Sequence, residues 1–171
     1  GKTTMLQKLM EGTNRKYVSL DDLNERSLAK SEPELFLQVH NPPVLIDEIQ
    51  YAPELFPYIK IYADSHHEPG AFWITGSQVF QMMRGVRESL AGRIAVLSMT
   101  SLAQAELAGA SMTPFKIDLE ALTEREKFRI HADVQGVFER LYRGSMPAIV
   151  SGRNTNSKIF HSSYYITSIK R

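Results

Sequence analysis

The sequence predicts an α/β domain with a parallel sheet, followed by a mostly helical segment. Short runs of apolar residues lie at 44–46, 71–75 and 94–99, as expected for strands that are buried on both faces. Helix-length amphipathic segments separate these runs, and strands that alternate with helices are typical of a parallel sheet. The alternation stops after Gly109. We therefore predict a domain over residues 1–112, and a helical connector or the start of a C-terminal region over residues 113–171.

The first elements follow one another closely. Residues 1–11 predict a helix, because their apolar residues recur at helical spacing before Gly12 ends the pattern. Residues 16–20 suit a short strand, and the two aspartates that follow can cap another helix. Residues 34–40 place their apolar side chains on one side of a helix, and two prolines then break the chain before the strand at 44–46.

The later elements repeat the alternation. Residues 52–65 carry an apolar stripe and predict a helix, which the strand at 71–75 follows. A helix is predicted over residues 78–90 and a further buried strand over 94–99. In the second segment, residues 133–143 form the pattern of an amphipathic helix.

Composition excludes several classes of protein. The formal net charge is +1, so no bulk field attracts nucleic acid or anionic lipid. Cysteine is absent, which excludes disulfides and thiolate catalysis and fits a cytoplasmic location. No apolar run is long enough to cross a membrane. The chain begins at Gly1 with functional residues and stops within a helical pattern at Arg171, so we expect a fragment truncated at both ends.

The first four residues match the end of a phosphate-binding loop. Gly1-Lys2-Thr3-Thr4 fits the last part of the pattern G-x-x-x-x-G-K-[ST], in which backbone N–H groups and a helix N-terminus surround phosphate oxygens. All four residues are candidates for nucleotide binding, with the Lys2 ammonium on the terminal phosphates. Thr3 would offer a hard oxygen ligand to Mg²⁺. The alternative is a flexible, solvated lysine at the N-terminus.

Two adjacent acids follow the strand at residues 44–46. The carboxyl edge of an open parallel sheet is where ligands bind, and Asp47 and Glu48 stand at this edge. Asp47 would hold Mg²⁺, largely through water, and Glu48 would orient the attacking water as the catalytic carboxylate. A solvated acidic turn is the alternative. The order of Lys2 and Thr3, an intervening strand and then the acid pair favours the catalytic interpretation.

Polar residues after the next strand, and an arginine further on, are also candidates. Thr75, Ser77 and Gln78 could sense the terminal phosphate or place water, although Ser77 could equally cap the next helix. Arg93, ahead of Arg87, could face a neighbouring subunit of a homo-oligomer and stabilise charge on its phosphate. The alternative for Arg93 is a solvated cation at a helix end.

Together these motifs resemble prokaryotic AAA+-superfamily ATPases, in particular the group that carries a separate C-terminal domain of unknown function. The resemblance implies a three-layer P-loop NTPase sheet with strand order 5-1-4-3-2, here without its first strand and most of its loop. It also implies a catalytic glutamate after strand 3, which is Glu48. The superfamily often has asparagine at the sensor position, where this sequence has Ser77-Gln78. The similar segments are residues 1–4, 44–50, 74–77 and 88–93, with further similarity at 101–107 and 142–147.

These observations lead to one main functional hypothesis. We expect ATP binding and Mg²⁺-dependent ATP hydrolysis, coupled to a conformational change in an attached domain or partner, with this fragment inactive by itself. The alternative is an ATP-dependent switch or scaffold with little turnover. A small-molecule kinase is less favoured because of the adjacent Asp47-Glu48 pair, and a structural module with a chance motif is the remaining alternative. The sequence does not indicate which protein partner would be involved.

Overall fold

The computed structural model describes residues 1–76, 89–109, 116–127, 133–153 and 156–166. The chain forms two compact units, Gly1–Ser98 and Met99–Arg171. The candidate residues from the sequence that fall within the described part of the chain all belong to the first unit.

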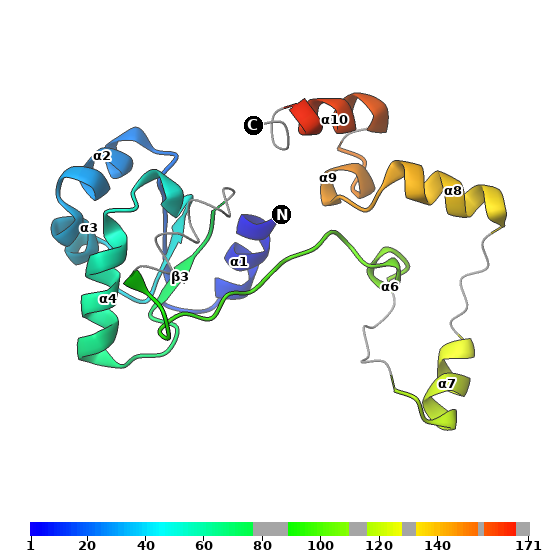
Figure 1. The fold of residues 1–171 in the computed structure, drawn as a ribbon, viewed down its shortest axis with the longest axis horizontal. Coiled ribbons are helices and arrows are strands. Elements are labelled where there is room, and N and C mark those ends of the chain that lie inside the picture. The colour runs from blue at the N-terminus through cyan, green and yellow to red at the C-terminus, as the bar shows by residue number, and fades with distance from the viewer. Residues whose placement is uncertain (77–88, 110–115, 128–132, 154–155, 167–171) are drawn as a thin grey trace. The chain divides into compact units, whose positions relative to one another are not determined.

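A parallel sheet forms the centre of the first unit (Figure 1). Its strands are β1 (Lys16–Ser19), β2 (Val44–Asp47) and β3 (Phe72–Ile74), in the order β1-β2-β3. In the register of β1 and β2, Ser19 lies opposite Asp47. Because all three strands run in the same direction, their carboxyl ends meet at one edge of the sheet.

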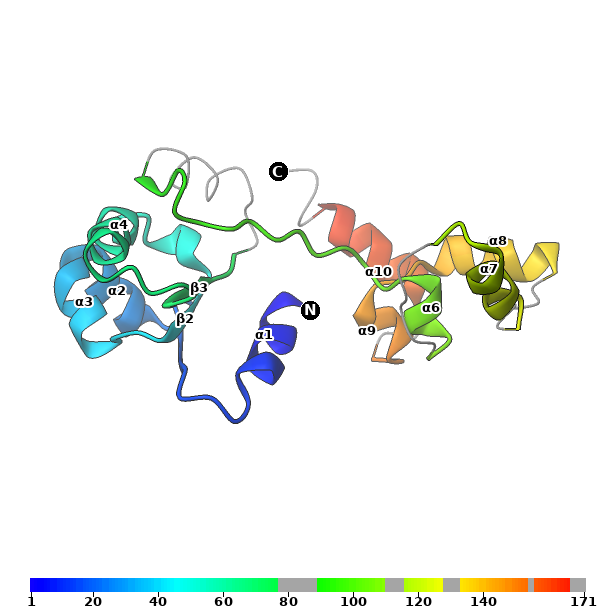
Figure 2. The same ribbon diagram turned by 90° about the horizontal axis from the view of Figure 1, so that it is seen from below.

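Helices connect these strands. They are α1 (Lys2–Met10), α2 (Leu23–Ser31), α3 (Pro33–Val39) and α4 (Leu55–His66), together with a 3₁₀ turn, η1 (Ile49–Tyr51). Figures 1 and 2 show α2, α3 and α4 on one side of the sheet and α1 on the other side. This arrangement confirms the predicted α/β unit with a parallel sheet.

The core lies between the sheet and helices α2, α3 and α4. Every residue of β2 is buried, as expected for a central strand that carries helices beside it. Side chains alternate across a strand, and Val44 and Ile46 of β2 point to the same face as Val18 of β1. The main buried residues of this core are Val18, Leu20, Phe36, Val44, Ile46, Ile49, Leu55, Phe56 and Ile59. Tight packing on this face fixes the position of the residues at the end of β2.

The aspartate cap predicted after the first strand is confirmed. The Asp22 carboxylate accepts hydrogen bonds from the backbone N–H groups of Asn24 and Glu25, in the first turn of α2. These bonds satisfy donors that have no partner inside the helix.

The predicted strand at residues 94–99 is wrong. The structure describes all six residues, and they form no strand. Ile94 packs against the core at the start of the run, but Val96, Leu97 and Met99 are 53%, 93% and 43% exposed. An apolar run indicates what a segment prefers to bury, but it does not supply the neighbouring strand that a sheet requires. The helix predicted at 78–90 lies almost entirely outside the described residues.

The secondary-structure elements that the structure describes between residues 99 and 171 are all helices. Its helices are α6 (Gln104–Leu107), α7 (Leu119–Glu126), α8 (Val134–Arg143), α9 (Pro147–Val150) and α10 (Ser157–Tyr164). The domain boundary near residue 112 falls in a stretch outside the described residues and stays a prediction. Among the helices that are described, none combines the length and apolar character needed to cross a bilayer.

Candidate functional site

A hydrogen bond joins the beginning of the chain to the end of the central strand. The Thr3 hydroxyl donates to Asp47 Oδ1 over 3.2 Å. Thr3 lies in the first turn of α1, and Asp47 is the last residue of β2, with only 5% of its surface exposed. The N-terminus of α1 therefore lies at the carboxyl edge of the sheet, where the sequence analysis expected Thr3 and Asp47 to meet.

The second oxygen of the same carboxylate has a partner on the neighbouring strand. The Tyr17 hydroxyl donates to Asp47 Oδ2 over 3.1 Å. Tyr17 precedes Ser19 by two residues, so both point to the face on which Asp47 lies. Burial raises the pKa of Tyr17 above its ordinary value of 10.0, and the charge of Asp47 acts in the same direction, whereas Ser19 opposes the shift. The phenol thus stays protonated as a donor at neutral pH.

From the sequence, Tyr17 is expected only as part of a strand, and it is not among the predicted site residues. One signal was present in the sequence: the alternation of side chains places Tyr17 on the same face as Ser19, the last residue of its strand. The register of β1 against β2 was the missing information, because a shift by one residue would turn Tyr17 to the opposite face.

Glu48 follows Asp47 in a left-handed backbone conformation, with φ 57° and ψ 43°. For a residue other than glycine this conformation costs about 1–3 kcal/mol, and it persists only where the surroundings hold it. The Gln50 side-chain amide donates to Glu48 Oε2, and Gln50 is 8% exposed. The backbone therefore reverses directly after the strand, and Gln50 contacts the carboxylate that the reversal carries.

The end of β3 supports this turn from the other side. Thr75 is 5% exposed, its backbone N–H donates to the Ile46 carbonyl over 3.0 Å, and its own carbonyl accepts from Ile49 N–H over 3.1 Å. These bonds lie on either side of the Asp47-Glu48 pair in the chain. Ser77 and Gln78, the other candidates after this strand, lie outside the described residues.

The remaining residues of the phosphate-loop motif are exposed at the beginning of α1. Lys2 and Thr4 face solvent, and the amino group of Gly1 lies 3.5 Å from Thr4 Oγ1. A Cβ added to Gly1 would meet no atom within 4 Å. The N-terminal end of a helix carries a partial positive charge and donor N–H groups. The N–H groups at this end of α1 are the kind of donors that bind an anion, and they lie on the same side of the sheet edge as Asp47.

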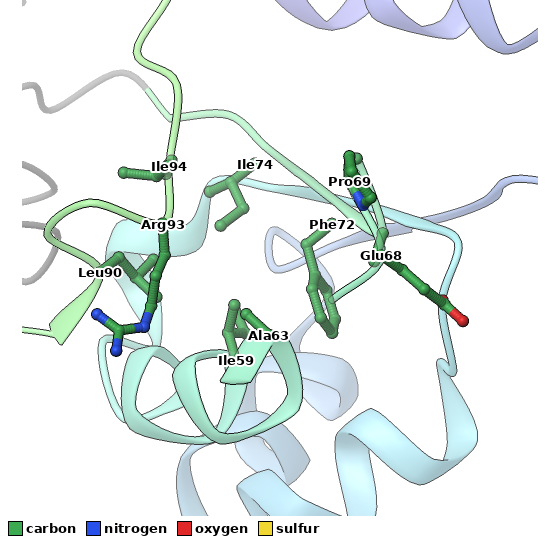
Figure 3. A pocket seen from close by; sticks show the side chains of 11 residues that line it. Ile59, Ala63, Glu68, Pro69, Phe72, Ile74, Leu90, Arg93 and Ile94 are labelled. Atoms are coloured by element: carbon green, nitrogen blue, oxygen red, sulfur yellow. The ribbon is translucent and has the colours of Figure 1, made fainter. Parts of the chain in front are cut away.

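Arg93 lies elsewhere in the unit. Its guanidinium forms an ion pair with Asp64, near the end of α4, and lines a pocket of about 110 Å³ (Figure 3). Residues 68–72, which precede or begin β3, line the same pocket, so it belongs to the amino edge of the sheet, opposite to Asp47. The pair lowers the pKa of Asp64 and raises that of Arg93. Arg87, the other candidate arginine, lies outside the described residues.

The oxygen ligands at the carboxyl edge of the sheet fit a hard divalent cation. A threonine hydroxyl and an aspartate carboxylate are the oxygen ligands that Mg²⁺ prefers, and Thr3 and Asp47 bring both to one point. Within the described residues, no three histidine or acidic side chains gather into a metal-binding cluster. Mg²⁺ requires no such cluster, because it keeps several waters and takes further ligands from substrate phosphates.

Comparisons of the sequence with known proteins identify the family of this chain. The chain is 30% identical over 103 residues to the uncharacterized proteins Rv2008c of Mycobacterium tuberculosis and Mb2031c of Mycobacterium bovis. The similar stretch covers 60% of this chain and 23% of either relative, so the match spans less than a quarter of the relatives' length. No solved structure matches the chain. A family model described as an AAA domain matches residues 1–108, which include Thr3, Asp47, Glu48 and Arg93. The chain therefore belongs to the AAA domain family.

Proposed function

We propose that the protein binds ATP together with Mg²⁺ and hydrolyses it. The observation that carries this proposal is the hydrogen bond between Thr3 and Asp47, which brings the phosphate-loop motif to the acidic end of β2. Membership of the AAA domain family supports it independently. We further propose that the complete domain has the three-layer P-loop fold and that it acts in the cytoplasm, which the absence of cysteine favours.

Each residue of the motif receives a role in nucleotide binding. The backbone N–H groups of Gly1 to Thr4 and the positive end of α1 bind phosphate oxygens, and the Lys2 ammonium binds the terminal phosphates. Thr3 and Asp47 hold Mg²⁺. When bound, this ion supplies neutralisation of the charge on the transferring phosphate.

Glu48 is proposed to orient the water that attacks the terminal phosphate. Glu48 directly follows Asp47 in a left-handed backbone conformation, and the Gln50 amide contacts its carboxylate, which supports this proposal. Ser77 and Gln78 are proposed to contact the terminal phosphate or its water. Positioning of this kind is the main contribution that a protein makes to phosphoryl transfer.

Arg93 is proposed to act on a neighbouring subunit of a homo-oligomer. Its place near the amino edge of the sheet separates it from the Asp47 site of its own chain, and 39% of its side chain is exposed. In this role it would leave Asp64 and stabilise charge on the neighbour's phosphate. Hydrolysis would then be coupled to a conformational change in an attached domain or partner.

Turnover and binding by the full-length protein test the proposal. Glu48→Gln should lower kcat by about 10²-fold or more, the scale of a general acid–base contribution, and leave ATP affinity unchanged. Glu68→Gln, the same change at the amino edge of the sheet, is the matched control and should leave kcat unchanged. Equal turnover by Glu48→Gln and wild type would remove Glu48 from the mechanism. Tight ATP binding without turnover in the wild type would indicate a nucleotide switch instead.

A further inference from the structure

We propose that Tyr17 is a positioning residue for the metal site: its hydroxyl holds the Asp47 carboxylate in the orientation in which the carboxylate serves Mg²⁺ beside Thr3. This inference rests on the proposed ATP and Mg²⁺ site, and it adds a residue on β1, whereas the two proposed ligands lie on α1 and β2. Tyr17 acts through Asp47 and is not itself a ligand.

The geometry at Asp47 carries the argument. The carboxylate has one hydrogen bond on each oxygen, from Thr3 to Oδ1 and from Tyr17 to Oδ2. The torsion that turns an aspartate carboxylate is broad, so packing of the backbone alone does not fix where its oxygens point. A hydrogen bond to each of the two carboxylate oxygens fixes their direction. If Thr3 turns its oxygen toward a metal, Tyr17 remains as the donor that keeps the carboxylate in place.

Tyr17 is well placed to act on the carboxylate without supporting the core. Its side chain is 40% exposed, whereas the neighbouring Val18, on the other face of β1, is 5% exposed and belongs to the core. Removal of the hydroxyl therefore changes the polar contact to Asp47 and leaves the packing of the sheet intact. Partners that orient metal-ligating carboxylates in this way typically contribute 10–100-fold to metal affinity or activity, by order of magnitude.

The experiment measures how strongly Mg²⁺ and ATP support each other's binding to the full-length protein. ATP affinity is determined by calorimetry with saturating Mg²⁺ and again in EDTA, and the ratio of the two affinities gives the metal coupling. Tyr17→Phe should reduce this ratio by about 10-fold, at the lower end of the usual range because the residue is partly exposed. ATP affinity in EDTA should remain at the wild-type value, which a general loss of structure would not allow.

A matched tyrosine supplies the control. Tyr62 also donates its hydroxyl to a carboxylate, that of Glu68 over 3.4 Å, but it does so away from the site. Tyr62→Phe should leave both affinities unchanged. A wild-type ratio in Tyr17→Phe would overturn the role of Tyr17 alone, and so would an equal loss of affinity with and without metal. If the wild-type protein binds ATP with the same affinity in Mg²⁺ and in EDTA, the proposed site is overturned, and the role of Tyr17 with it.

Discussion

The Arg15 side chain links the amino ends of β2 and β3, and its replacement should destabilise the first unit. The guanidinium lies over the Trp73 ring, 4.0 Å from the ring centroid. It also donates to three backbone carbonyls at the amino ends of β2 and β3: Val44 over 3.3 Å, Ala71 over 3.2 Å and Gly70 over 2.8 Å. One side chain thus satisfies a row of acceptors at the amino edge of the sheet.

The size of the effect follows from these contacts. A cation over an aromatic ring at a partly exposed site contributes about 1 kcal/mol. Hydrogen bonds from a charged donor contribute about 1.5–3 kcal/mol each when buried, but these three share one guanidinium and partial burial lowers its pKa, a sign of desolvation that offsets part of the gain. We therefore expect Arg15→Met to cost about 3 kcal/mol. Arg15→Lys keeps the charge but loses the planar fork, and we expect a cost of about 1–2 kcal/mol.

Urea unfolding followed by far-ultraviolet circular dichroism measures both values. Tryptophan emission is less suitable, because Trp73 is the only tryptophan and lies against the mutated residue. Arg153→Met, at an exposed arginine of the second unit, is the control and should be close to neutral. Wild-type stability in Arg15→Lys would refute the importance of the fork, and wild-type stability in Arg15→Met would refute the whole argument.

Two further predictions concern the core and the pH dependence of stability. Phe36→Ala should lower the free energy of unfolding in urea by about 3–5 kcal/mol, because the side chain is fully buried. Leu35→Ala, at a 46% exposed position, should lower it far less. Equal losses of stability would contradict the packing described. Arg93→Gln should raise the pKa of Asp64 toward its ordinary 3.8. Since Arg93 lowers the pKa of Asp64 in the folded state, the ion pair should stabilise the fold above pH 3.8. This stabilisation should disappear as the pH falls through the pKa that Asp64 has in the folded protein. Urea unfolding of wild type and Arg93→Gln across acidic pH measures it. A stability difference that stays constant down to low pH would contradict the pair.

Much of the first unit was predictable because local and long-range signals agree there. The apolar run at Val44 lies between prolines and acids, and the strand formed where this run predicted it. The helix of residues 1–11 and the aspartate cap before α2 were equally predictable, since spacing and capping chemistry are local properties. The position of Asp47 at the ligand-binding edge followed from topology, because a parallel sheet collects the carboxyl ends of its strands there, and the phosphate-loop motif pointed to Thr3 as its neighbour.

The failures have a common physical cause. The exposed run around Leu97 shows that strand formation depends on a neighbouring strand, which the sequence of the run does not contain. Tyr17 was missed as a site residue because its contact with Asp47 depends on the register between β1 and β2. The contact of Gln50 with Glu48 likewise depends on a left-handed turn that a residue other than glycine rarely adopts. Each of these features is set by tertiary structure.

The most direct test of the central claim is the metal dependence of ATP binding when Asp47 is changed. Calorimetry of the full-length wild-type protein should show tighter ATP binding with Mg²⁺ than in EDTA, and Asp47→Asn should abolish most of that difference. Asp21→Asn removes the same charge from an exposed position just past the end of β1, and this variant should keep the wild-type difference in ATP affinity. Full metal dependence in Asp47→Asn, or none in the wild type, would contradict a magnesium–nucleotide site between α1 and β2.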